Sequence, residues 1–281
     1  DGRYAGPREG LRIIDGRGGV VVPGLVNTHT HSYGNLAKGL IDNAPLDVYA
    51  LYVTAEASVR TREDIELGAY LHAVEMLRSG CTTWLDHLSA DLEGLLAAAR
   101  AYRQVGGRVV LVPQFADLPY QDTLPGPPPR VSSQFLQRPF AGLPERTARE
   151  KLLQDLREFI AACHRPAEGI YAGVGPSGPQ RCSRELLLAS AELAEEYGVI
   201  WHTHVLETRS QELVAYEKYG ESILAYLRRL ALLQPRHSLA HVIWVSPAEI
   251  ELLAQAGVHV IHNPVANMPL GVGLMPFLRM V

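Results

Sequence analysis

Short apolar runs alternate with helical segments along most of the chain, and this alternation limits the possible folds more than any other feature. The runs fall at residues 20–27, 81–88, 108–115, 169–175, 199–205, 238–244 and 258–262. Strands that alternate with helices form parallel sheets, because each helix returns the chain to the same end of the sheet. We therefore predict an α/β fold. A (β/α)8-type barrel fits best, and a doubly wound sheet is the alternative.

Residues 118–147 interrupt this alternation. They contain seven prolines, which exclude a regular helix or strand over most of the segment. A long irregular segment of this kind is typical of a lid or binding loop, and equally of a surface excursion. The residues alone favour neither interpretation.

The two ends of the chain also depart from the pattern. Residues 1–19 are rich in glycine and arginine and predict an irregular lead-in. Residues 20–281 carry the alternation and are expected to form the barrel. Because only seven strand candidates are present, we expect this barrel to be truncated before its eighth strand.

The composition narrows the choice of partners and compartment. The formal net charge is -4 over 281 residues, which argues against nucleic acid or an anionic membrane as the main partner. No apolar run approaches the roughly 18 residues of a membrane-spanning helix. The three cysteines are scattered, which argues against a disulfide framework. We expect a reduced, cytoplasmic protein.

Histidines cluster where the predicted strands end. His29 and His31 are two residues apart at the end of the first run, and His202 and His204 repeat this spacing at the fifth. Alternate residues of a strand share a face, so each pair can present two imidazoles to one metal ion. Barrel active sites form at this end of the strands.

Three further residues extend the cluster. Glu207 follows the fifth run, where it can either transfer protons beside a metal-bound water or cap the next helix. His241 lies in the sixth run and His262 ends the seventh. Four groups at four strand ends together predict a metal-dependent active site.

Taken in order, these motifs resemble the amidohydrolase superfamily. The segments are PGLVNTHTH at residues 23–31, His204-x-x-Glu207, Ala240–His241 and His262–Asn263–Pro264. Within the superfamily, the chain is similar to the mononuclear metal-dependent deaminases: guanine, 8-oxoguanine, S-adenosylhomocysteine and cytosine deaminases, together with the triazine hydrolases. The resemblance covers nearly the whole chain.

The resemblance implies a function and a set of site residues. It implies a metal-dependent deaminase that releases ammonia from an amino-substituted heterocycle such as a purine, pterin or pyrimidine. His29, His31 and His204 would bind the metal, and Glu207 would carry protons to a ring nitrogen. His241 would polarise or deprotonate the metal-bound water.

The resemblance also implies the cofactor and the assembly. One divalent ion is expected, zinc first and iron second, because the lysine that bridges two metals in binuclear relatives is absent from the strand ends. The protein would be a homodimer acting on a small heterocyclic substrate. Residues 1–19 would be the remnant of a small β-sandwich domain.

One departure keeps other functions open. The family's last metal ligand is an aspartate after the eighth strand, and this chain has no aspartate after Asp155. A triazine-type chlorohydrolase or a cyclic-amide hydrolase would use the same centre on another leaving group. A catalytically inactive barrel that serves as a binding subunit is the further alternative.

Overall fold

Seven parallel strands form one sheet in the order of the sequence, from β1 to β7. The computed structural model describes residue 6 and residues 9–12, 14–16, 18–41, 43–118, 120–126 and 145–281. The strands are β1 (Leu25–Thr30), β2 (Cys81–Leu88), β3 (Arg108–Phe115), β4 (Ile170–Pro176), β5 (Ile200–Val205), β6 (His237–His241) and β7 (His259–Ile261).

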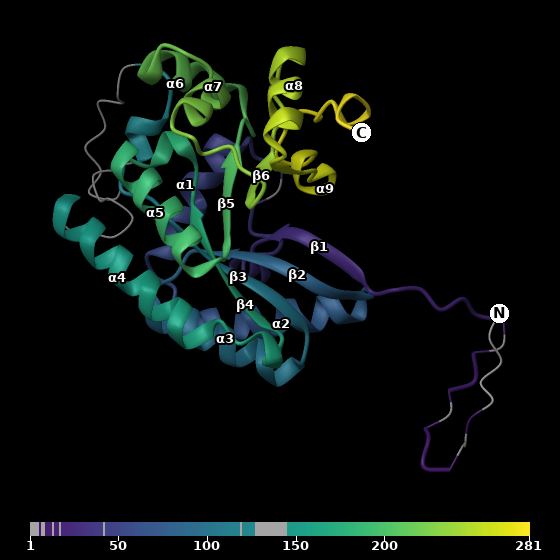
Figure 1. The fold of residues 1–281 in the computed structure, drawn as a ribbon. Coiled ribbons are helices and arrows are strands. Elements are labelled where there is room, and N and C mark those ends of the chain that lie inside the picture. Colours follow the sequence, from purple (N-terminus) through teal and green to yellow (C-terminus); the bar gives the residue numbers. More distant parts are fainter. Residues whose placement is uncertain are drawn as a thin grey trace.

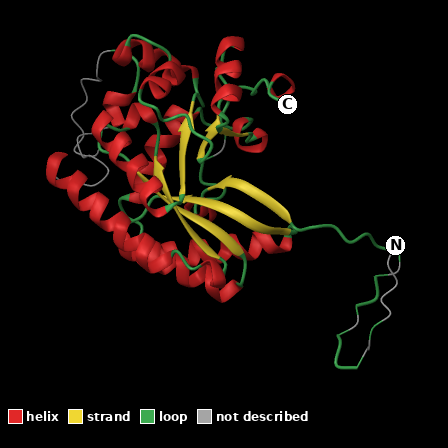
Figure 2. Ribbon diagram, viewed as in Figure 1, coloured by secondary structure: helices red, strands yellow, loops and turns green. Residues whose placement is uncertain are grey.

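The helices lie around the outside of this sheet (Figures 1 and 2). They are α1 (Leu46–Ala57), α2 (Arg62–Arg78), α3 (Leu92–Val105), α4 (Glu145–Cys163), α5 (Arg184–Tyr197), α6 (Arg209–Tyr219), α7 (Ile223–Arg229), α8 (Pro247–Ala256) and α9 (Pro264–Asn267). The strands and helices together make a nearly closed (β/α) barrel, which confirms the predicted fold class. Within the described residues, β1 and β7 are the two edges of the sheet and no eighth strand joins them.

Local sequence signals set most of the helix boundaries. Thr61 and Asp64 form a capping box at the start of α2, and Ser246 forms one with Glu249 at the start of α8. Gly198 ends α5 in the left-handed conformation with φ +64°, which glycine adopts at little cost. These contacts satisfy backbone groups at the helix ends.

Two predicted strands have clearly different boundaries. The first strand begins at Leu25, not at residue 20, because β2 starts at Cys81 and pairs there with Leu25. The sixth strand ends at His241, because the backbone turns to positive φ at that residue.

The core packs the helices against strands that are buried on both faces. Trp84 of β2 and Trp201 of β5 are fully buried, and the Trp201 indole N–H donates to Ser190 Oγ of α5 at 3.0 Å. Strands covered on both faces are typical of parallel sheets. This packing holds the carboxyl ends of the strands at one end of the barrel.

The chain enters the barrel through a segment without regular structure. Described residues between 6 and 24 contain no helix or strand, and the segment that enters β1 extends away from the barrel (Figure 1). Its origin in a small β domain stays a prediction.

Of the proline-rich segment, residues 119 and 127–144 lie outside the described part of the chain. Cys81, Cys163 and Cys182 are free and buried.

Candidate active site

Four histidines predicted from sequence converge in the barrel. The ring centroids of His29 and His31 are 4.7 Å apart, and those of His29 and His204 are 4.9 Å apart. His241 lies 5.3 Å from His29 and 5.5 Å from His204. The fold thus joins side chains in or just after β1, β5 and β6 that are up to 212 residues apart in the chain (241 minus 29).

Backbone carbonyls fix the orientation of two of these rings. His31 Nδ1 lies 2.7 Å from the carbonyl oxygen of His87, and His204 Nδ1 lies 2.6 Å from that of Ser177. A carbonyl only accepts, so each Nδ1 carries the proton and each Nε2 offers a lone pair. The two Nε2 atoms face each other at 3.3 Å.

The distance between these two nitrogens suits a tetrahedral metal site. Two nitrogens that each lie about 2.0–2.1 Å from zinc in a tetrahedral site are roughly 3.3 Å apart. His29 Nε2 is buried beside them and has no hydrogen-bond partner. The ligand atoms of His29, His31 and His204 lie within 4.8 Å of one another. The three predicted metal ligands therefore fit a single divalent ion.

Burial favours the neutral form of these three imidazoles. Burial lowers the pKa of His31 to about 4, although its hydrogen bond to the His87 carbonyl opposes that shift. Burial, followed by the neighbouring histidines, lowers the pKa values of His29 and His204 as well. Neutral imidazoles with facing lone pairs are the form that binds metal.

A second group of histidines lies deeper in the barrel. His29, His87 and His202 also bring ligand atoms within 4.8 Å of one another. However, His29 Nδ1 and His202 Nε2 are only 2.8 Å apart, which is a hydrogen-bond distance and too short for two ligands of a tetrahedral ion. The deeper group is therefore a hydrogen-bonded layer beneath the first.

Glu207 lies at the rim of the same centre, as predicted. It follows β5, its backbone N–H donates to Gln211 Oε1 at 3.0 Å, and its side chain is buried. Burial, assisted by the charge of Asp47, raises the pKa of Glu207 to about 8. In the metal-free chain the carboxyl therefore keeps its proton at neutral pH and can donate it.

His241 faces Glu207 from the end of β6. Its Nε2 lies 3.4 Å from Glu207 Oε1, and its Nδ1 lies 2.9 Å from Asn267 Oδ1. Because the amide oxygen accepts, Nδ1 carries the proton and Nε2 is free to accept one. Positive φ values at His241 (76°) and Val242 (45°) turn the chain at this point. Such backbone conformations are uncommon for these residue types and concentrate at functional sites.

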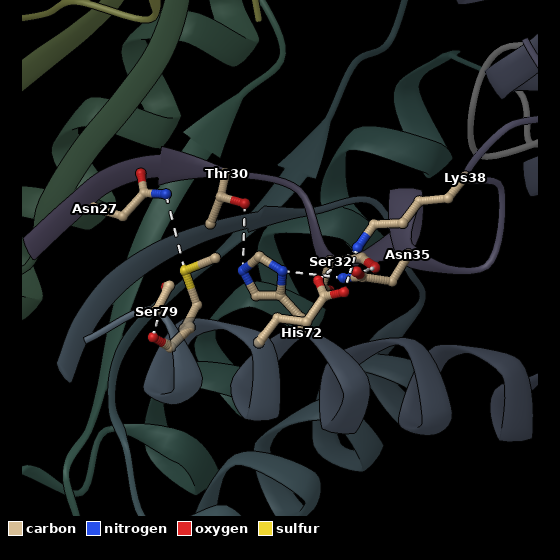
Figure 3. A network of polar contacts seen from close by, with 9 residues as sticks. Asn27, Thr30, Ser32, Asn35, Lys38, His72 and Ser79 are labelled. Carbon is tan, nitrogen blue, oxygen red and sulfur yellow. Dashed lines mark hydrogen bonds and ion pairs between the residues drawn. The ribbon is translucent and has the colours of Figure 1, made fainter. Parts of the chain in front are cut away.

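A polar network lies beside the segment that carries His29 and His31, and Figure 3 shows the part of it around His72. His72 of α2 contacts Thr30 Oγ1 at 3.2 Å and accepts from the Asn35 side chain at 3.0 Å. The backbone N–H and hydroxyl of Ser32 both donate to buried Asp86, at 2.8 and 2.7 Å. Thr30, which lies between His29 and His31, and Ser32, which follows them, are thus held in place by side-chain hydrogen bonds.

The centre opens into a cavity of about 770 Å³. The five predicted site residues line it: His29, His31, His204, Glu207 and His241. Gln114 and Arg181, which the sequence did not establish as site residues, line it too. The size is that of a pocket for a drug-sized molecule, which includes nucleosides.

Sequence reasoning missed several supporting groups. Asn267 contacts a predicted site residue, His241, through its side chain, and the neighbouring His262–Asn263–Pro264 motif could have suggested it. The carbonyls of His87 and Ser177 could not be found this way, because every residue has a carbonyl and only the fold aims it. Within the described residues, no aspartate joins the three histidines in either candidate metal group.

Comparison with known proteins places the chain in a family. The model of the amidohydrolase family matches residues 20–281, and the chain belongs to that family. The 5'-deoxyadenosine deaminase of Methanothermobacter thermautotrophicus is 32% identical over 283 residues, which cover 98% of this chain and 58% of the relative. The 5-methylthioadenosine/S-adenosylhomocysteine deaminase of Thermococcus kodakarensis is 34% identical over 96% of this chain and 57% of the relative.

A solved structure shows the same likeness. The adenosine deaminase from Xanthomonas campestris with bound zinc superposes with a TM-score of 0.75 at 26% identity, covering 92% of this chain and 53% of that protein. The chain therefore spans a little over half the length of the relatives it matches. No helix within the described ranges is long and apolar enough to cross a membrane.

Proposed function

We propose that the chain carries the metal centre of a hydrolytic deaminase that acts on an adenosine derivative. One observation carries the proposal. Three imidazoles with ligand nitrogens within 4.8 Å of one another line the same cavity as a buried carboxyl whose pKa is raised to about 8. The names of the relatives supply the substrate class.

His29, His31 and His204 would hold one zinc ion, with iron as the alternative metal. A divalent metal supplies a water of lowered pKa, which is the nucleophile that hydrolysis requires at neutral pH. The facing lone pairs of His31 and His204 and the unpartnered Nε2 of His29 support this role.

Glu207 and His241 would move the protons. Glu207, in its protonated form, donates to the ring nitrogen beside the carbon that bears the exocyclic amine. His241 Nε2, 3.4 Å from Glu207, accepts a proton from the water as it adds to that carbon. His241 then returns this proton to the exocyclic amine, and the new hydroxyl gives its remaining proton to the Glu207 carboxylate. The bond to the amine breaks, so ammonia leaves as the ring carbonyl forms.

The test measures metal content and ammonia release on the same samples. The purified protein, loaded with zinc, is assayed on 5'-deoxyadenosine, methylthioadenosine and adenosine, with guanine, cytosine and an aminotriazine for comparison. We expect ammonia from the adenosine derivatives. We also expect Glu207→Gln to abolish turnover while keeping its zinc, and exposed Glu192→Gln to leave both unchanged.

Other outcomes point to other functions. Chloride release from a chlorotriazine, or ring opening without ammonia, would favour the alternative hydrolases. No bound metal and no turnover would favour an inactive binding barrel.

Three further predictions accompany the proposal: a single ion, a homodimer and a cytoplasmic location. Metal analysis, sedimentation and cell fractionation test them.

A further inference from the structure

We propose that His202 and Ser238 are positioning residues that hold His29 in the tautomer and orientation needed for metal binding. This inference rests on the proposed metal site. His202 and Ser238 are buried in neighbouring strands, where they are register partners in the β5–β6 ladder. Neither residue lines the cavity.

The three side chains form a continuous hydrogen-bonded line. Ser238 Oγ lies 2.7 Å from His202 Nδ1, and His202 Nε2 lies 2.8 Å from His29 Nδ1. β5 and β1 are not neighbours in the sheet, so this contact crosses the barrel interior. His29 is thereby tied to the opposite side of the barrel.

The chemistry of the line permits one arrangement of protons when His29 binds metal. A ligand Nε2 needs its lone pair, so Nδ1 of His29 carries the proton and donates to His202 Nε2. His202 then carries its own proton on Nδ1 and donates to the hydroxyl of Ser238.

His202 thus gives the Nδ1–H of His29 a hydrogen-bond acceptor, as backbone carbonyls do for His31 and His204. His31 donates to the His87 carbonyl and His204 to the Ser177 carbonyl. Partners of this kind fix ligand orientation, and their loss typically weakens metal binding about 10–100-fold. His29 is the ligand whose partner is a side chain, so mutation can remove it.

The experiment measures zinc affinity by competition with a chromophoric chelator, with the visible spectrum of the cobalt-loaded protein as a second readout. His202→Phe keeps a ring of similar size and removes the acceptor, whereas His202→Gln keeps an acceptor. Ser238→Ala removes the far end of the line. Ser190→Ala is the matched control, because it removes another buried hydroxyl that bonds a ring nitrogen. Circular dichroism of the metal-free proteins checks folding.

We expect His202→Phe to weaken zinc binding about 10–100-fold and to change the cobalt spectrum. His202→Gln should recover most of the affinity, Ser238→Ala should lose less than His202→Phe, and Ser190→Ala should match wild type. Unchanged zinc affinity in folded His202→Phe overturns the inference. If that variant does not fold, wild-type affinity and spectrum in Ser238→Ala overturn it instead.

Two other results also decide against the inference. An equal loss in Ser190→Ala would show that any disturbance of the core weakens the site. Absence of zinc binding in the wild type would overturn the proposed metal site together with this inference. Wild-type binding with unaffected variants overturns the positioning role alone.

Discussion

Replacing Glu207 by glutamine tests whether burial keeps this carboxyl protonated in the folded chain. The pKa of Glu207 is raised from an ordinary value of 4.5 to about 8, mainly by burial. A carboxyl with a raised pKa contributes stability that is present below its ordinary pKa and is lost as the pH rises through about 8. Glutamine has a similar shape and does not titrate.

The size of the effect follows from the two pKa values. Each tenfold change in proton affinity corresponds to about 1.4 kcal/mol, so full ionisation of Glu207 costs the fold about 5 kcal/mol. Between pH 5 and pH 9, the metal-free wild type should lose about 4 kcal/mol of unfolding free energy relative to Glu207→Gln. Most of this difference should develop by pH 8.

Urea unfolding followed by tryptophan fluorescence measures this difference, with a chelator present at each pH because a bound cation would lower the pKa of Glu207. Glu192→Gln, which changes an exposed carboxylate on α5, is the control and should track wild type. A difference between wild type and Glu207→Gln that stays constant across this pH range would refute the reasoning. Glu207 would then ionise normally and could not serve as the acid.

Three further predictions concern the metal and the core. Zinc should remain bound at pH 5.5, because burial lowers the pKa of His31 to about 4 and protons compete only near that value; metal analysis after dialysis checks this, and half-release above pH 6 would contradict it. Asp86→Asn should lower the unfolding free energy by about 3 kcal/mol, since donors that now meet a buried carboxylate would face an amide; urea unfolding measures it. Gly107→Ala should cost about 1–3 kcal/mol, because the new methyl would lie 2.1 Å from the Trp84 ring, whereas Gly16→Ala meets nothing within 4 Å and should be neutral in the same assay.

The sequence predicted the fold class and most of the elements. Residues 81–88 and 108–115 form β2 and β3 with the predicted boundaries, because each is a short apolar run between clear helix signals. A capping box at Ser246 marks the start of α8 in the sequence, whereas α1 and α9 have no side-chain cap at their start.

The predicted boundaries failed where tertiary contacts decide them. Val20, Val21 and Val22 suit a strand, yet they are exposed because β2 begins too late to pair with them. The run at 238–244 is mostly apolar, but the backbone turns at His241, whose ring faces Glu207. Local preference cannot show either event, since both depend on a partner distant in sequence.

The sequence by itself determined the alternation of strands and helices and the residue types at the strand ends, including the imidazoles of His29, His31 and His204. These follow from local periodicity and spacing. Only the tertiary structure decided which nitrogen of each ring faces the centre, because the partners of Nδ1 are the His87 carbonyl, the Ser177 carbonyl and the remote side chain of His202. It also decided the protonation of Glu207, because the pKa of a carboxyl depends on how completely the folded chain removes it from water.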